Sequence, residues 1–279
     1  MKKISRRSFL AAAGLSVAAL ALTACGGSSA STASSVASSA ASSEAASTSA
    51  AAGELTTVEA GKLTMATNAA FPPYEMTTDA GEFEGIDIET AQAIADKLGL
   101  ELQIDDMDFD AALLSVQQGK ADIVMAGVTV TDERKAVMDF SDSYATGIQS
   151  IIVPEGSDIA SPDDLAGKKI GTQRGTTGYI YCSDDFGDES VVAYDDGLTA
   201  VQALNNGQVD AVVIDNAPAK EFVAANPGLV ILDTSYAEED YAIGVAKGSS
   251  LKDAVNAALE ELKADGTLQS IVDKYITAE

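Results

Sequence analysis

The sequence predicts an α/β protein with two lobes, each built on a sheet of mostly parallel strands with flanking helices. Short apolar runs alternate with segments of helical periodicity along most of the chain, which is the pattern of α/β layers. This alternation occurs in two successive series, and each series predicts one lobe. About 225 residues follow the low-complexity N-terminus, which is enough for one large or two small domains with a sizeable core.

The first series begins with an apolar run and contains two segments of helical periodicity. Apolar residues recur at helical spacing up to Gly99 in the first segment and up to Gly119 in the second, and glycine is the common residue at a helix end. The predicted strands are 63–66, 101–104 and 123–126, and the predicted helices are 87–98 and 110–118.

The second series begins with a strand that ends at Pro154. Ser161 and Pro162 then predict a helix start, with serine as the N-cap and proline in the first turn. The predicted strands are 149–153, 169–172, 191–194, 211–214 and 241–245, and the predicted helices are one starting at 162, then 176–181, 197–205, 217–225, 249–263 and a last one ending at 275.

Residues 1–24 indicate an export signal rather than part of the fold. Four basic residues precede a mostly apolar segment, 9–24, which is too short and too rich in alanine to span a bilayer as a stable helix. The segment ends in Leu22-Thr-Ala-Cys25, which resembles the lipobox of bacterial lipoproteins, where the cysteine is acylated. An ordinary signal peptide with a chance cysteine is the alternative. Residues 25–53 are mostly Gly, Ser, Ala and Thr and predict a disordered tether.

Composition excludes several classes of function. The formal net charge is −26, so nucleic acid and anionic lipid headgroups are poor partners. The chain has no histidine, and its two cysteines are Cys25 and Cys182. Without histidine there is no His-based catalytic triad and no zinc site of the Cys/His type. We therefore expect no catalytic residue, no metal site and no cofactor.

The segment 125–134, Met-Ala-Gly-Val-Thr-Val-Thr-Asp-Glu-Arg, lies where a predicted strand ends. Ligands bind at the carboxyl ends of strands in open α/β sheets. Gly127 allows a close approach of the backbone, and we expect Asp132 to cap a short helical turn that contains Arg134. The hydroxyl of Thr129, free backbone N–H groups and a guanidinium could together hold a carboxylate. A solvated turn in which the arginine pairs with a neighbouring acid is the alternative.

A second glycine-rich segment, 171–178, has the sequence Gly-Thr-Gln-Arg-Gly-Thr-Thr-Gly and lies between a predicted strand and a predicted helix. Successive N–H groups at a helix start favour an anion. No Gly-Lys-Ser/Thr follows, so the segment is not a P-loop. A simple strand-to-helix turn is the alternative.

Five segments together resemble the periplasmic-type amino-acid-binding proteins of ABC importers. They are Ala66–Glu75, Gly85–Ile88, Gly127–Arg134, Phe140–Tyr144 and the segment 171–178, and they occur in the order found in that family. The resemblance covers roughly residues 60–279. It implies that the C-terminal helices return to the first lobe, so that lobe 1 is 54–146 plus 242–279 and lobe 2 is 147–241. The implied two-segment hinge lies near 144–148 and 239–243.

The resemblance also implies how the head group of an amino acid is held. The α-carboxylate is expected against Arg134 and the backbone at Thr177. The α-ammonium is expected against Asp215, together with Thr129 and the carbonyl of Gly127. As an alternative, Asp215 is only the N-cap of the helix that follows it.

The expected side-chain pocket combines aromatic residues and amides. Phe71, Tyr74 and Phe109 match the aromatic positions of the family, although a core or turn role is the alternative for all three. Asn68 and Gln173 match positions that face the side chain of the ligand. The predicted ligand-binding residues are Asn68, Phe71, Tyr74, Phe109, Ala126, Gly127, Thr129, Arg134, Gln173, Thr177 and Asp215.

The function implied by the resemblance is transport rather than catalysis. We expect a monomeric lipoprotein, anchored through Cys25 at the extracytoplasmic face of the cell membrane, that delivers a polar amino acid to an ABC permease. The two amides favour a neutral, glutamine-like side chain, with a basic amino acid or cystine as alternatives. A ligand sensor that docks onto a receptor, or a dehydratase-type enzyme on the same scaffold, are the alternative functions.

Overall fold

The computed structural model describes residues 55–276, which lie within one compact unit. The predicted signal segment 1–24, the tether 25–53 and the anchor Cys25 lie outside the described residues. Among the described helices, none has both the length and the apolar character needed to cross a membrane.

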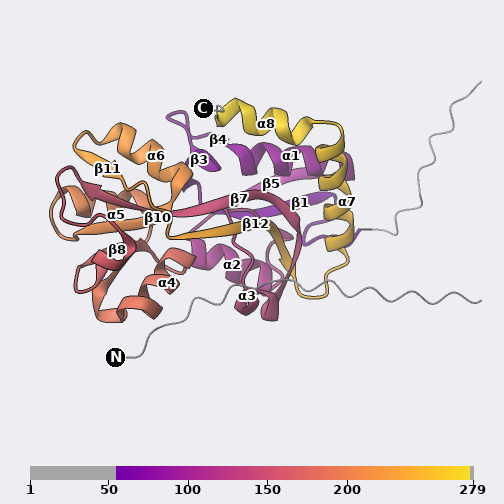
Figure 1. Ribbon diagram of the computed structural model, residues 1–279. Helices are drawn as coiled ribbons and strands as arrows, with labels where there is room; N and C mark the ends of the chain where they lie inside the picture. The colour runs from indigo at the N-terminus through magenta and orange to yellow at the C-terminus, as the bar shows by residue number, and fades with distance from the viewer. Residues whose placement is uncertain (1–54, 277–279) are drawn as a thin grey trace, which may run out of the picture. The chain divides into compact units, whose positions relative to one another are not determined.

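One mixed sheet of nine strands forms the centre of this unit (Figure 1). The strand order is β5–β1–β6–β12–β7–β10–β8–β9, and β11 pairs with β7. The strands are β1 Lys62–Thr67, β5 Glu101–Asp106, β6 Ile123–Val124, β7 Met138–Pro154, β8 Ile170–Gln173, β9 Val191–Tyr194, β10 Ala211–Asp215, β11 Leu229–Ile231 and β12 Ala237–Ala246. The predicted α/β class is confirmed.

The sheet is parallel at its two ends and antiparallel in the middle. Strands β5, β1 and β6 pair in parallel and are called the first half; β10, β8 and β9 pair in parallel and are called the second half. Strands β7 and β12 run antiparallel to one another along most of their length and join the two halves. The segments predicted as hinge, 144–148 and 239–243, lie in this pair. The lobe boundaries derived from them stay a prediction.

Strand β7 is much longer than the predicted strand 149–153. Its first part, residues 139–147, is rich in polar side chains and gives no apolar run, but it pairs with β12. A second sheet was also missed, formed by β2 Ala70–Phe71, β3 Glu75–Thr77 and β4 Phe83–Glu84. These strands are only two or three residues long, and they carry Phe71 and Glu75.

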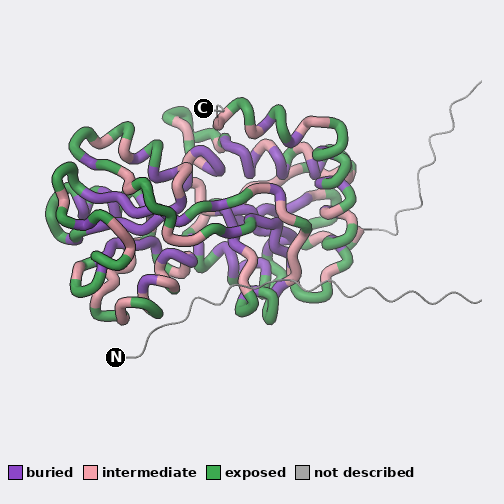
Figure 2. The backbone as a smooth tube through the Cα atoms, in the orientation of Figure 1, coloured by how far each residue is buried: buried purple, intermediate pink, exposed green. Residues whose placement is uncertain are grey.

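Helices cover the buried strands (Figures 1 and 2). The C-terminal helices α7 and α8 pack on α1, beside the first half of the sheet, and α4, α5 and α6 pack against the second half. The predicted helix end at Gly99 is confirmed, since this residue has φ 69°. The N–H of Gly99 donates to the carbonyl of Asp96, and the N–H of Leu100 donates to that of Ala95. The helices are α1 Ile86–Leu98, α2 Phe109–Gln117, α3 Asp132–Val137, α4 Thr177–Phe186, α5 Gly197–Asn205, α6 Asn216–Ala225, α7 Leu251–Ala264 and α8 Thr267–Tyr275, with short 3₁₀ turns η1 Pro162–Leu165 and η2 Asp188–Ser190.

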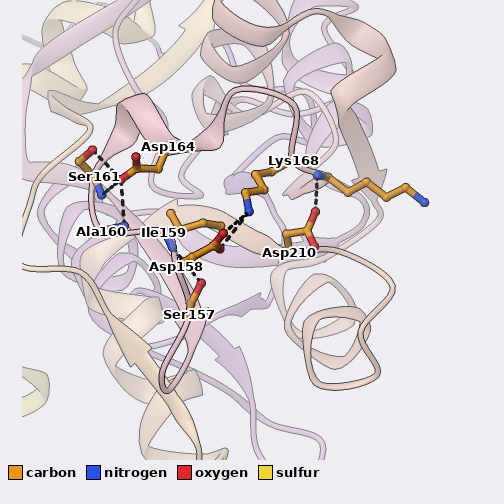
Figure 3. Close-up of polar contacts among 9 residues, drawn as sticks. Ser157, Asp158, Ile159, Ala160, Ser161, Asp164, Lys168 and Asp210 are labelled. Atoms are coloured by element: carbon orange, nitrogen blue, oxygen red, sulfur yellow. Dashed lines mark hydrogen bonds and ion pairs between the residues drawn. The ribbon is translucent and has the colours of Figure 1, made fainter.

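The connection from β7 to β8 is held by its own acidic side chains (Figure 3). Asp164 accepts hydrogen bonds from the backbone N–H groups of Ala160 and Ser161, which fixes the start of η1. Lys168 lies 2.9 Å from both carboxylate oxygens of Asp158. These exposed contacts hold the surface loop that leads from β7 to β8.

Candidate functional site

The start of α3 places Arg134 inside the molecule. Thr131, rather than Asp132 as expected, is the N-cap, because its backbone is extended and its side chain accepts the Arg134 N–H at 3.1 Å. The guanidinium is buried, donates to the carbonyl of Thr129 at 2.8 Å and to that of Gly175 at 3.2 Å, and lies 5.3 Å from the ring centre of Phe109. Neither acceptor is a carboxylate, so these two contacts do not neutralise the charge of Arg134. A guanidinium has five N–H donors, and its remaining donors can bind an anion.

Within residues 55–276, several contacts join segments beside the first half of the sheet to segments beside the second half. One is the bond from Arg134 to Gly175. The second is a hydrogen bond of 2.8 Å from Gln173 to the amide oxygen of Asn68. In the third, the hydroxyl oxygens of Thr129 and Thr177 lie 3.5 Å apart. The structure is therefore closed over the space between these segments.

Asp215 ends β10 and occupies the N-cap position of α6, but its carboxylate makes no capping bond. It accepts instead a hydrogen bond from the amide of Gln149 at 2.8 Å and one from the Tyr241 hydroxyl. Burial is the main cause that raises the pKa of Asp215 to about 7, and the nearby charge of Glu239 adds to it. The side chain of Asp215 thus faces inward, and the role of helix N-cap does not explain its position.

Glu75, on β3, is fully buried, and its carboxyl receives no hydrogen bond from a donor among the described residues. It lies against the carboxyl of Asp87, to which it donates a hydrogen bond when it is protonated. Burial, followed by the neighbouring charge of Asp87, raises its pKa well above the ordinary range. Asp87 itself accepts bonds from the N–H of Gly127 at 3.0 Å and the hydroxyl of Tyr144 at 2.7 Å. A buried carboxylate without a donor is costly, so Glu75 favours a bound donor or a proton.

The two amides of the predicted side-chain pocket are used by the protein itself. Asn68 donates to the carbonyl of Met107 at 3.0 Å and accepts from Gln173. Gln173 also donates to the carbonyl of Asp195 at 3.2 Å. Their polar atoms therefore need a ligand less than the carboxyl of Glu75 does.

A small cavity lies among these side chains. Ten of the eleven predicted residues line it, and Glu75 and Thr176 line it as well. The lining residues are Asn68, Phe71, Glu75, Phe109, Ala126, Gly127, Thr129, Arg134, Gln173, Thr176, Thr177 and Asp215.

Tyr74 is the predicted residue that does not line this cavity. Its ring stacks on Phe71 at 5.9 Å and meets the edge of Tyr241 at 5.3 Å. It lines a larger neighbouring pocket, which Asp215 also borders. Tyr74 thus packs between the two spaces, as the core alternative for this aromatic residue implied.

Sequence reasoning missed Gln149, Glu239 and Tyr241, which are buried around Asp215. The missed signal is the alternation along β12, where Glu239 and Tyr241 are buried and their neighbours Glu238 and Asp240 are exposed. A glutamate two positions before a buried tyrosine in a strand shares its face.

The raised carboxyl pKa values predict how stability depends on pH. Asp215 has a pKa of about 7 in the folded protein and an ordinary value of 3.8, so the folded state keeps a proton that the unfolded chain releases. This stabilising contribution is complete below about pH 4 and is lost as the pH rises to about 7. We predict that the unfolding free energy of the wild type falls between about pH 5 and pH 8 by roughly 2–4 kcal/mol more than that of Asp215→Asn.

Urea denaturation of the ligand-free protein at several pH values measures this difference. Asp233→Asn, at an exposed position, is the control and keeps the pH dependence of the wild type. If Asp215→Asn also keeps it, Asp215 is ionised throughout and this assignment is wrong.

Comparison with known proteins shows which family this chain matches. The family described as bacterial extracellular solute-binding proteins, family 3, matches residues 63–278. The L-cystine-binding protein TcyJ of Escherichia coli (strain K12) is 33% identical over 226 residues, which are 79% of this chain and 85% of TcyJ.

Solved structures of amino-acid-binding proteins have the same fold. The arginine-, lysine-, histidine-binding protein ArtJ of Geobacillus stearothermophilus is 34% identical with a TM-score of 0.75, covering 78% of this chain and 96% of ArtJ. An ancestral arginine-binding protein bound to glutamine is 42% identical with a TM-score of 0.75, covering 79% of this chain and 100% of that one. The chain therefore belongs to the bacterial extracellular solute-binding proteins of family 3.

Proposed function

We propose that this protein captures a polar amino acid in the cavity around Arg134 and Asp215 and delivers it to the permease of an ABC importer. The observation that carries the proposal is that the buried guanidinium of Arg134 and the buried carboxyl of Asp215 line the same small cavity. An amino-acid zwitterion offers the complementary pair of charges. TcyJ binds L-cystine, and ArtJ binds arginine, lysine and histidine, which supports the same class of ligand.

In this proposal the α-carboxylate binds to Arg134 and the backbone at Thr177, and the α-ammonium binds to Asp215. The lobes 54–146 with 242–279 and 147–241 close on the ligand. The contacts from Arg134 to Gly175 and from Gln173 to Asn68 support closure, because each joins residues assigned to different lobes. A bidentate guanidinium contact suits a carboxylate in geometry and charge.

For the side chain of the ligand we propose a cationic group first and a glutamine-like amide second, which reverses the order expected from the sequence. Asn68 and Gln173 bind each other and the backbone. The carboxyl of Glu75 instead receives no donor among the described residues and lies against another carboxyl, that of Asp87. A guanidinium or ammonium donates only, and it would ionise this carboxyl and pair with it. The ancestral relative, solved with glutamine and also with arginine, supports keeping both classes.

We also propose that the protein is held at the extracytoplasmic face of the membrane by acylation of Cys25. The support is the lipobox-like sequence and the Ser/Ala-rich segment that follows it. We predict that Cys25→Ser releases the mature protein into the soluble fraction or leaves the precursor uncleaved, because the acylated thiol is lost. Membrane fractionation and mass spectrometry measure this, and an unchanged acylated membrane form contradicts it.

A binding screen tests the function as a whole. Thermal unfolding with each of the twenty amino acids and cystine should give one clear stabilised set, since ligand at 100 times its Kd adds about 2.7 kcal/mol. Arg134→Ala should abolish the effect, because loss of one partner of a buried pair costs roughly 3–5 kcal/mol.

Arg174→Ala is the matched control for this screen, since Arg174 has an exposed side chain and precedes Gly175, whose carbonyl accepts from Arg134. A wild-type response in Arg134→Ala contradicts the proposed site. Unchanged recovery of the ligand separates binding from a dehydratase reaction. Loss of uptake on deletion of the gene separates transport from sensing.

The cationic preference has its own test. Glu75→Gln keeps the shape but removes the charge, and we predict that it weakens arginine binding by roughly 10- to 100-fold, with a much smaller effect on glutamine. Calorimetric titration with arginine and glutamine measures the ratio, and exposed Glu82→Gln is the control. Tighter binding of glutamine than arginine by the wild type, with no change of the ratio in Glu75→Gln, favours the amide instead.

A further inference from the structure

Glu239 does not line the cavity, yet it contacts two residues that do. One of its oxygens, Oε2, accepts hydrogen bonds from the hydroxyls of Thr129 at 3.1 Å and Thr177 at 2.9 Å, and from the amide of Gln149 at 3.0 Å. The side chain is buried, and the hydroxyl of Tyr181 also interacts with its carboxylate. Three donors thus converge on one oxygen behind the wall of the cavity.

The direction of these hydrogen bonds is fixed by chemistry. A carboxylate only accepts, so each threonine must use its single hydroxyl hydrogen toward Glu239. The amide nitrogen of Gln149 lies 2.8 Å from Asp215, and 3.4 Å from the hydroxyl oxygen of Thr177. Reversing this amide would set its oxygen against two carboxylates. The two amide hydrogens of Gln149 go to the nearer carboxylates of Asp215 and Glu239, and the hydroxyl hydrogen of Thr177 goes to Glu239 at 2.9 Å.

A hydroxyl whose hydrogen is committed presents only lone pairs to other neighbours. Thr129 and Asp215 line the same cavity, and both then offer acceptors there. Neither threonine hydroxyl can donate to a carboxylate, so the anionic group of a ligand depends on Arg134 and on backbone N–H groups. Two acceptors in one small cavity suit a group with several donors and no lone pair, which is a primary ammonium.

We propose that Glu239 is a positioning residue that turns the hydroxyl hydrogens of Thr129 and Thr177 away from the cavity and thereby makes the head-group site selective for a free α-ammonium. This inference rests on the proposed function, since it assumes an amino acid in the cavity. It adds a specific cause for selectivity that lies outside the cavity lining. Removing Glu239 frees both hydroxyls to donate, so the penalty for a ligand without the ammonium becomes smaller.

The test compares arginine with 5-guanidinopentanoate, which is arginine without its α-amino group. The ratio of the two Kd values is measured by calorimetry for each variant, because a general structural weakening affects both ligands and cancels. We expect Glu239→Ala to lower the wild-type preference for arginine at least about tenfold, which is the effect of one hydrogen bond to a charged group. Glu238→Ala, at the exposed neighbouring position, leaves the ratio unchanged.

Glu239→Gln separates hydrogen-bond direction from charge. Its amide oxygen can still accept from both threonines, so we expect the preference to stay within about threefold of the wild type. If Glu239→Gln loses the preference as fully as Glu239→Ala, charge alone is responsible and the proposal is overturned. An unchanged ratio in Glu239→Ala also overturns it.

Thr129→Val tests the same idea without a change at Glu239, in case Glu239→Ala does not fold. We expect weaker arginine binding, by about tenfold, and unchanged binding of 5-guanidinopentanoate, because the hydroxyl accepts from the ammonium only. Equal weakening of both ligands means that the hydroxyl binds the carboxylate and overturns the proposal.

If arginine is not the ligand, the amino acid selected in the binding screen and its desamino analogue replace this pair. If the wild type binds no amino acid at all, the proposed function itself fails.

Discussion

The site depends on an imbalance of buried charge. The carboxyls of Glu75, Asp87, Asp215 and Glu239 are buried together with the single guanidinium of Arg134. Burial raises the pKa of Asp87 to about 6 and that of Asp215 to about 7, because little positive charge is near to offset the loss of water. Bound protons, hydrogen bonds from protein donors or a cationic ligand must therefore compensate the buried negative charge.

The protein meets part of this need with fixed neutral donors. Asp87 receives the N–H of Gly127 and the hydroxyl of Tyr144, and Asp215 receives Gln149 and Tyr241. Glu75 receives no such donor among the described residues and, when protonated, donates to Asp87. The cavity therefore contains one carboxyl already placed by hydrogen bonds and one that a ligand can complete. This difference is the physical basis for assigning Asp215 to the head group and Glu75 to the side chain.

The long pair of β7 and β12 brings these groups together. The pairing shifts in register at Tyr241, and a side chain at Gly147 would place its Cβ 2.5 Å from the ring of Tyr241. Glycine at this position lets the ring lie flat against β7, where its hydroxyl reaches Asp215. Backbone pairing in the middle of the sheet thus fixes a contact at the wall of the cavity.

The sequence predicted the features that are local, and less of those that depend on tertiary pairing. Apolar periodicity and terminal glycines located the strands of both halves and helix ends such as Gly99. Short motifs located ten cavity-lining residues. The polar first part of β7 has no apolar run, so its pairing with β12 could not be read from composition. Glu239 was missed because it is buried only when those two strands meet.

Glu75 shows the same limit at the level of chemistry. Its place beside the Phe-Pro-Pro-Tyr segment was plain in the sequence, but its complete burial follows from the short β2–β3–β4 sheet, whose strands are too short to give a pattern. The amides of Asn68 and Gln173 were correctly placed at the cavity, yet the sequence could not show that they bind each other. Ligand preference depends on which polar groups are left unpaired, and that is a property of the folded structure.

A crystal structure of the protein with bound arginine tests the central claim most directly. The account predicts one arginine in the cavity, with its α-carboxylate on Arg134, its α-ammonium on Asp215 and its guanidinium on Glu75. An arginine bound in the reverse direction, with the guanidinium on Asp215, would contradict this assignment. An empty cavity at saturating arginine would contradict the proposed ligand class.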